Sequence, residues 1–471
     1  MSAVPSISSV TDHYVSVIRV PTVLVGVRSR LSAWMEKCRM AKSNEGLSWE
    51  SAAEARRRFF ILVSRDADNI AGLSTQLQFG IYKAIKTNKR VCFGYRTVFM
   101  PSIFKRVRVV WVRHRHAIHK LKSPYLVNSP LKAIGGIAAF MVGVRCFLAF
   151  IVDLVRYKLQ IHNQVQKYPR FGLGVNDLFE ANNSPGFDKR NDSSWKELYE
   201  VDLHLKLPDK DREKCSETFR KLGLEEKRYV CLHIRTPAYK GTSDLENSGF
   251  RNATPSNYIS AIKFLIKNGM KVVRLGDRAE NLLPKIDGLI DYASSEYKSE
   301  EMDIYLIQNS FFFFGTNSGI YDTAMLLSVP VLAVNVSEFL IAKPYKMVDL
   351  FVHKRIFSKK LGRVLTFKEL FSQDQPPTFD GHEFIENSSE DLGYAVEEQY
   401  RNLISGNVNR APRQVVFSNH LNSAVRRWID GSAVADAIDK YRDVKLERQE
   451  ILAHLEYNGS FVENFVSKYY A

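Results

Sequence analysis

Three groups of polar residues in this chain have the chemistry to bind an anion, and each group ends an apolar run. The groups are His233 with Arg235 after Tyr229–Ile234, Arg274 with Gly276 and Asp277 at the end of Met270–Leu275, and Gly315, Thr316, Asn317, Ser318 and Gly319 after Phe311–Phe314. An arginine can bind a diphosphate through two parallel hydrogen bonds, and glycine lets a backbone approach a ligand closely. These residue types therefore predict a diphosphate site.

The apolar runs have the length and β-branched content of buried strands, and helical patterns separate them. The predicted helices are Pro255–Lys267, Glu300–Gln308 and Ile320–Leu327, and Val329–Asn335 is a further short strand. Strands that alternate with helices through short connections predict a parallel, doubly wound α/β sheet. The carboxyl ends of such strands meet at one edge, where open α/β sheets bind ligands.

Individual roles follow from the position of each side chain. Arg235 is the residue that we expect to stabilise the β-phosphate of a departing nucleotide, because negative charge develops there in the transition state; an interdomain salt bridge is the alternative. His233 lies two residues earlier, on the same side of the strand, and is either a general base or a hydrogen-bonded core histidine. Asp277 is a candidate ligand for a ribose or a base, or a helix cap.

The turn Gly315–Gly319 combines small residues, hydroxyl groups and a following helix start at Ile320. Backbone N–H groups at a helix N-terminus point outward and attract anions. The turn therefore predicts a phosphate or sugar-hydroxyl contact. Thr254 is a suitable N-cap for the helix that begins at Pro255.

Composition sets the limits within which such a site operates. The chain has 471 residues, of which 45% are hydrophobic and 25% are charged, as in ordinary globular proteins with two or three domains. An excess of 67 basic over 51 acidic residues leaves a net charge of +16, which favours a nucleotide, nucleic acid or acidic lipid as partner.

The five cysteines are scattered without a CxxC pair, so we expect reduced thiols rather than disulfides or a zinc site. No signal peptide is evident at the N-terminus, which predicts a cytoplasmic protein.

The basic residues are concentrated in one segment. Lys105–Lys132 contains eight Lys or Arg and no acid, and the apolar stretch Ala133–Val155 follows it, broken by Arg145 and Asp153. About 20 apolar residues can span a bilayer, but a charge near the middle costs at least about 2.5 kcal/mol. Three interpretations stay open for the stretch: a buried core helix, an interfacial contact with anionic headgroups at the inner membrane, and a transmembrane helix.

Breaks in these patterns divide the chain into four parts. Residues 1–58 are a helical N-terminal extension, and residues 59–210 form an α/β domain that opens with strand Phe59–Ser64, helix Asn69–Thr87 and strand Arg90–Tyr95. The loop-rich segment Tyr168–Lys210 ends that domain. Residues 211–406 form the second α/β domain, and residues 407–471 a helical C-terminal extension.

Five motifs in order carry a resemblance to a known family. They are VCLHIR, FRNATPSNYISAIKFLIKNGMKVVRLGD, DIYLIQNSFFFFGTNSGIYDTAMLLSVPVLAVN, LTFKELF and GHEFIENSSEDLGYAVEEQ. Together they resemble a bacterial family of glycosyltransferases related to the fucosyltransferase-like GT-B enzymes, strongly over Tyr229–Tyr400 and weakly over Phe59–Tyr95. The order of the five motifs is more specific than any one of them.

The resemblance implies two Rossmann-like domains that face a cleft, with a nucleotide-sugar donor bound mainly by the C-terminal one. It also implies an inverting transfer to a glycan or lipid-linked acceptor, without a metal or other cofactor. The residues agree with the last point, since arginine can neutralise a diphosphate without an ion. The pair Arg251-Asn252 recurs in the family, which makes Arg251 a second phosphate or acceptor contact or a structural loop anchor, and Asn252 its partner in donor binding.

The chain departs from the family pattern at one place. An acid often follows the HxR motif in that family, whereas Thr236 and Pro237 stand here, so the general base is unidentified. Asp244 and Glu246 in the next loop are candidates for it, or solvated loop charges. The alternative function is a non-catalytic protein that binds a membrane or nucleic acid through residues 105–132. Nucleic acid is not favoured, because aromatic residues are sparse there and no recognition motif is present.

Overall fold

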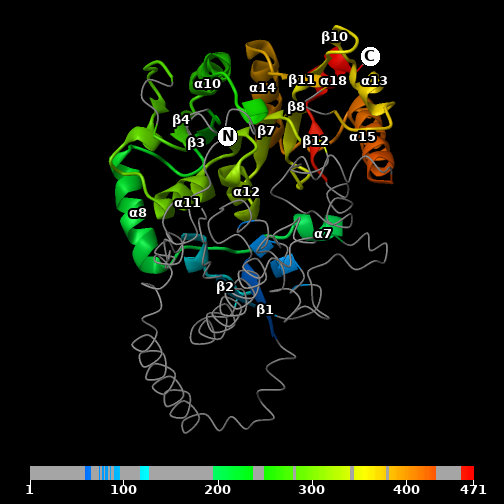
Figure 1. Ribbon diagram of the computed structural model, residues 1–471. Helices are drawn as coiled ribbons and strands as arrows, with labels where there is room; N and C mark the ends of the chain where they lie inside the picture. Colours follow the sequence, from blue (N-terminus) through cyan, green and yellow to red (C-terminus); the bar gives the residue numbers. More distant parts are fainter. Residues whose placement is uncertain are drawn as a thin grey trace, which may run out of the picture. The chain divides into compact units, whose positions relative to one another are not determined.

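The structure is a computed structural model that describes residues 59–64, 74, 77–78, 80–82, 85, 90–95, 117–126, 195–236, 249–278, 283–339, 344–377, 381–430 and 458–470 (Figure 1). Several predictions lie outside these residues: the helical extension 1–58, the apolar stretch 133–155, and the loop carboxylates Asp244 and Glu246. Among the helices in the described ranges, none has both the length and the apolar character needed to cross a bilayer.

A seven-stranded parallel sheet forms the centre of the described structure. Its order is β12 (Ser460–Phe461), β8 (Leu350–His353), β7 (Val331–Val336), β6 (Phe313–Thr316), β3 (Tyr229–His233), β4 (Lys271–Leu275) and β5 (Leu289–Ile290). Every neighbouring pair is parallel, and strands β3, β6 and β7 are buried at every position. Continuous burial is expected when helices cover both faces. The predicted α/β class and parallel sheet are confirmed, with strand ends shifted by up to two residues.

The strand order reverses between β3 and β6. Starting from β3, the chain adds β4 and β5 on one side, then returns to place β6, β7 and β8 on the other. This is the order of a Rossmann-type sheet, in which the crevice at the reversal point binds the ligand. The reversal places the end of β3 directly beside the end of β6, because His233 pairs with Gly315 in the strand register.

Helices cover the two faces of the sheet (Figure 1). On one face α10 (Ile259–Lys267) packs against α14 (Ser389–Ser405), and on the other α11 (Glu300–Asn309) contacts both α8 (Asp209–Lys221) and α12 (Gly319–Leu326). These helices confirm the predicted pattern.

The predicted helix Pro255–Lys267 begins as the 3-10 helix η5 (Pro255–Tyr258). Thr254 occupies the N-cap position but makes no side-chain cap hydrogen bond. Its hydroxyl instead donates to Glu386 at 3.2 Å. The hydroxyl therefore joins η5 to the segment before α14 rather than capping the helix.

The C-terminal part of the chain completes the sheet rather than extending away from it. Helix α15 (Pro412–Asp430) precedes β12, which pairs with β8 as the edge strand, and α18 (Glu463–Tyr469) follows. The region after residue 407, predicted as helical, thus also supplies a strand. Phe461 packs on Phe351 and Phe417 with ring centroids 4.0 Å apart in both cases, which joins these elements in one core.

Smaller elements surround this core. A three-stranded antiparallel sheet has the order β10 (Arg363–Val364), β9 (Arg355–Ser358) and β11 (His382–Ile385). The short helices are η1 (Ala117–Lys120), α7 (Trp195–Tyr199), η4 (Gly249–Arg251), η6 (Tyr292–Ser294) and α13 (Phe367–Phe371). Strands β1 (Phe59–Ser64) and β2 (Arg90–Tyr95) form a separate two-stranded sheet, which confirms both predicted strands.

Part of the predicted basic segment contacts the protein itself. The ammonium of Lys120 lies 2.5 Å from Glu301 and 3.5 Å from Asp211, and the backbone of Lys122 forms an antiparallel bridge with Lys206. Lys120 is therefore neutralised by acidic residues of α11 and α8. The charge of Lys120 therefore helps to hold η1 against α8 and α11.

Candidate functional site

Hydrogen bonds join the ends of β3 and β6 at the reversal point of the sheet. The backbone N–H of Arg235 donates to Thr316 Oγ1 at 3.0 Å, and the Arg235 carbonyl accepts from Ala253 N at 2.9 Å. His233 Nδ1 lies 3.3 Å from Thr316 Oγ1 and 3.2 Å from Ser318 Oγ. The structure thus brings together both predicted catalytic residues and the predicted turn.

The imidazole of His233 is buried and surrounded by cations. Burial, together with the positive charges of Arg235, Arg274 and Lys298, lowers its pKa to about 3. The ring is therefore neutral near pH 7. Thr316 Oγ1 accepts from Arg235 N and also pairs with His233 Nδ1, and the tautomer of the ring decides which of those two atoms donates. This arrangement corresponds to the hydrogen-bonded core histidine, the alternative to a general base.

Two glycines allow the strand ends to approach this closely. A Cβ on Gly315 would lie 2.2 Å from the carbonyl oxygen of His233, so only glycine fits between β3 and β6 there. Gly276 has φ +110°, a conformation that side chains disfavour, and a Cβ there would lie 2.9 Å from His233 Cδ2. Both predicted glycines are needed for the backbone and the histidine ring to fit.

The turn leads into α12 through a capped start. Ser318 is the N-cap residue, and its hydroxyl accepts from Tyr321 N at 3.5 Å. Gly319 is the first helical residue, so the free N–H groups of the first turn lie at the carboxyl edge of the sheet. Together with the helix dipole they favour an anion at this position.

The predicted pair Arg251-Asn252 lies against the same turn. Arg251 Nη2 donates to the Asn317 carbonyl at 3.2 Å, and the carbonyl of Asn252 accepts from Lys354 Nζ at 2.6 Å. Lys354 follows β8 and is buried, which lowers its pKa to about 8, while the charge of Glu386 opposes the fall. Sequence reasoning missed Lys354, although a lysine directly after an apolar strand is the same signal that identified Arg235.

Arg274 is held within the domain. Its side chain is 3% exposed, and its Nη2 lies 2.5 Å from Asp291 Oδ1. It also donates to Ser294 Oγ at 2.9 Å and to the Asp277 carbonyl at 3.1 Å. Arg274 thus contributes charge to the edge while its hydrogen bonds fix the segment after β4. Burial raises the pKa of Asp277, and the charges of Lys298, Arg235 and Arg274 oppose this, so its carboxyl belongs to the same charged edge.

A carboxylate that sequence reasoning missed also lies beside the turn. Glu338 Oε2 accepts from Asn317 Nδ2 at 2.7 Å. It follows the apolar strand β7, so polar residues after a buried strand would again have identified it. Glu338 adds an acidic member to an edge that is otherwise rich in cations.

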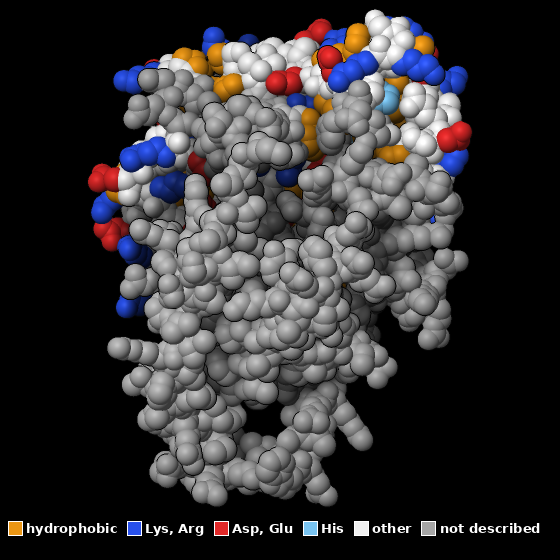
Figure 2. Space-filling model, viewed as in Figure 1, with side chains coloured by type: hydrophobic (Ala, Val, Ile, Leu, Met, Phe, Trp, Pro, Cys, Tyr) orange, Lys and Arg blue, Asp and Glu red, His pale blue; other side chains and the backbone are white. Residues whose placement is uncertain are grey.

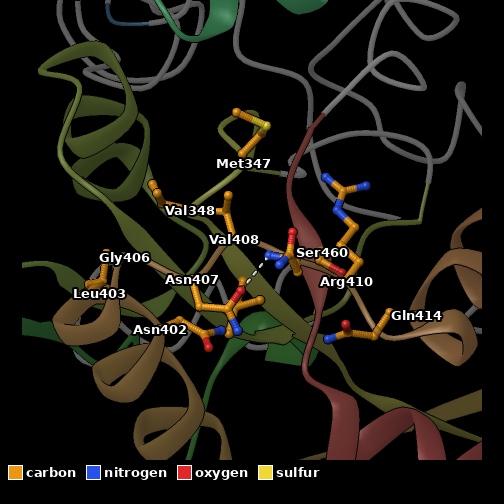
Figure 3. Close-up of a pocket in the computed structure, with 12 residues that line it drawn as sticks. Met347, Val348, Asn402, Leu403, Gly406, Asn407, Val408, Arg410, Gln414 and Ser460 are labelled. Carbon is orange, nitrogen blue, oxygen red and sulfur yellow. Dashed lines mark hydrogen bonds between the residues drawn. The ribbon is translucent and has the colours of Figure 1, made fainter.

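A pocket lies at the opposite edge of the sheet. It is lined by residues that include Leu350 and Ser460, the first residues of β8 and β12, together with Asn407, Arg410 and Gln414 (Figure 3). Strands β8 and β12 begin beside this pocket, whereas the predicted anion site lies at the opposite, carboxyl edge of the parallel sheet. The pocket is therefore separate from the predicted anion site.

Charges of both signs lie on the described surface that Figure 2 shows. On the face shown in Figure 2, Lys and Arg side chains alternate with Asp and Glu among the described residues.

Among comparisons with known proteins, the search of solved structures gives a likeness in fold. No family model matches the chain, and no curated protein matches it. A solved structure of a glycosyl transferase family 9 protein from Veillonella parvula DSM 2008 is similar, with 10% identity and a TM-score of 0.39 over 74% of this chain and 97% of that one.

Proposed function

We propose that the chain is a glycosyltransferase that moves a sugar from a nucleotide-sugar donor to a hydroxyl acceptor. The observation that carries the proposal is the reversal point between β3 and β6, where Arg235 meets the turn Gly315–Gly319 and the start of α12. Arg235 and the N–H groups at the start of α12 both lie at this reversal point. A diphosphate is the ligand that such a group of donors fits. The resemblance over Tyr229–Tyr400 suggests that this diphosphate belongs to a nucleotide sugar.

The reaction is a direct displacement. The acceptor oxygen forms a bond to the anomeric carbon, while the bond from that carbon to the β-phosphate oxygen breaks and leaves its electron pair on the diphosphate. Direct displacement inverts the anomeric carbon. Arg235 and the N–H groups at the start of α12 stabilise the charge that the leaving diphosphate gains, so that the chain's own cations perform this step.

His233 acts in this mechanism as a positioning residue. Its Nδ1 lies within hydrogen-bond distance of the hydroxyls of Thr316 and Ser318, and these contacts hold the turn against the end of β3. The low pKa keeps the ring neutral near pH 7, so that no further positive charge is placed beside these hydroxyls. The general base for the acceptor hydroxyl stays unassigned.

The test begins with binding, which needs no knowledge of the acceptor. Thermal unfolding of the full chain is measured with UDP, GDP, ADP and their hexose esters. A ligand at 100 times its Kd adds about 2.7 kcal/mol of stability, so the matching nucleotide gives a clear rise in Tm. A panel in which no nucleotide raises the Tm would overturn the proposal.

Arg235→Ala tests the assigned residue, and Arg228→Ala is its matched control. Both arginines flank β3, but Arg228 precedes the strand and is exposed at the opposite edge. Each lost hydrogen bond to a charged group costs about 1.5–3 kcal/mol, so Arg235→Ala weakens diphosphate binding at least tenfold. Release of nucleoside diphosphate during transfer falls about 100-fold or more. Equal binding and turnover in the two variants would refute the role of Arg235.

A further inference from the structure

The carboxylate of Glu338 and the amide of Asn317 form a polar pair at the ends of β7 and β6. Asn317 Nδ2 donates to Glu338 Oε2 at 2.7 Å, and Asn317 is 1% exposed. This contact fixes the orientation of the amide, because turning it over would place two oxygens against each other. The Asn317 Oδ1 atom is therefore an acceptor held beside the anion-binding turn.

Two buried acceptors of this region have no hydrogen-bond partner in the part of the chain that the structure describes. They are Asn317 Oδ1 and the hydroxyl oxygen of Ser337, the residue that precedes Glu338 and is 1% exposed. Leaving a buried polar atom unpaired costs about 1–3 kcal/mol, and buried polar groups are paired in the great majority of cases. Such atoms next to a ligand site point to donor groups on the ligand.

The charge of the pair separates it from the diphosphate site. Arg235 and the start of α12 attract an anion, whereas Glu338 repels one. Burial raises the pKa of the neighbouring Asp322 well above its usual range, with the charge of Arg251 opposing and that of Glu338 reinforcing the rise. The raised pKa favours the protonated form of Asp322, and Glu338 is the carboxylate of this corner that pairs with Asn317.

We propose that Glu338 and Asn317 bind hydroxyl groups of the transferred sugar, and that this sugar carries no acidic group. Sugar hydroxyls donate hydrogen bonds to carboxylate and amide oxygens, and a uronic acid would bring a second negative charge against Glu338. This inference rests on the proposed function. It adds the chemical class of the donor: a nucleoside diphosphate bearing a neutral hexose or deoxyhexose.

The experiment compares the nucleotide with and without its sugar. Binding of UDP, UDP-glucose and UDP-glucuronic acid is measured by calorimetry on the full-length wild type and Glu338→Gln, or with the GDP, GDP-mannose and GDP-mannuronic acid set if guanine nucleotides give the larger thermal shift. Glu338→Gln keeps the acceptor for Asn317 but removes the charge. We expect at least a tenfold loss of affinity for the neutral sugar nucleotide, an unchanged Kd for the nucleoside diphosphate, and a smaller preference for the neutral over the acidic sugar.

Glu383→Gln is the control, since Glu383 is an exposed carboxylate on β11, in the other sheet. Equal affinity of wild type and Glu338→Gln for the sugar nucleotide overturns the inference and leaves the proposed function standing. An equal loss for the nucleoside diphosphate and its sugar ester also overturns it, because Glu338 would then only support the turn. If no nucleotide binds the wild type, the proposed function itself fails.

Discussion

Among the glycines that the structure describes, Gly315 is the one whose replacement by alanine brings the shortest new contact, so Gly315→Ala is expected to be strongly destabilising. A Cβ at this position would lie 2.2 Å from His233 O and 3.0 Å from both His233 C and His233 N, all of them backbone atoms that cannot rotate away. Strands β3 and β6 would have to separate by about 1 Å to restore an ordinary contact. Overpacking of a core costs about 1–3 kcal/mol, and each ladder hydrogen bond lost adds about 1 kcal/mol.

We therefore expect Gly315→Ala to lower the free energy of unfolding by about 3–5 kcal/mol, a large part of the 5–15 kcal/mol typical of domains. Urea unfolding followed by circular dichroism measures this change. Two glycines serve as controls. Gly249→Ala meets no atom within 4 Å and should be neutral, whereas Gly393→Ala, in α14 with its nearest contact at 3.9 Å, should stabilise by about 0.5–1 kcal/mol. A Gly315→Ala protein within 1 kcal/mol of wild type would refute the described approach of β3 to β6.

Two further perturbations test the charges around the site. Asp291→Ala removes the carboxylate that pairs with Arg274, whose side chain is 3% exposed, and breaking a buried pair costs about 3–5 kcal/mol. Because Asp291 itself is 45% exposed, we expect the free energy of unfolding to fall by only about 2 kcal/mol in urea unfolding. An unchanged free energy of unfolding would show that water replaces the Asp291 carboxylate fully. Burial raises the pKa of Asp349 to about 7, so the folded state holds a proton that the unfolded state releases near pH 4, and stability falls as pH rises from about 4 to 7. The stability advantage of wild type over Asp349→Asn should therefore shrink between pH 4.5 and pH 7.5, and a constant advantage would contradict the raised pKa.

Much of the fold is readable from local pattern. The runs that became β3, β4, β6 and β7 are mainly apolar, with no regular alternation of polar residues, and this is typical of strands covered on both faces. Helices α11 and α12 begin within one residue of their predicted starts, Glu300 and Ile320. Residues 1–58 and 133–155 lie outside the described ranges, so the predictions made there stand as predictions.

Features that join distant segments could not be predicted in this way. The side chains of Asn335 and Asn387, both buried, each accept from the other's backbone N–H, at 2.7 and 2.6 Å, and so tie the end of β7 to the start of α14. β12 is only two residues long, Ser460–Phe461, and becomes a strand because β8 offers it an edge. Such contacts depend on strand order, which no local pattern contains.

The sequence by itself determined which residue types stand at the strand ends: His233 and Arg235, the glycines, and the hydroxyls of the turn. These follow from local periodicity, since a polar residue after an apolar run lies at the end of a strand. Only the tertiary structure decided which of them meet. The reversal of strand order places β6 beside β3, so the backbone of Arg235 hydrogen-bonds Thr316. Arg274 instead pairs with Asp291. Glu338, which follows β7, lies beside Asn317, which follows β6.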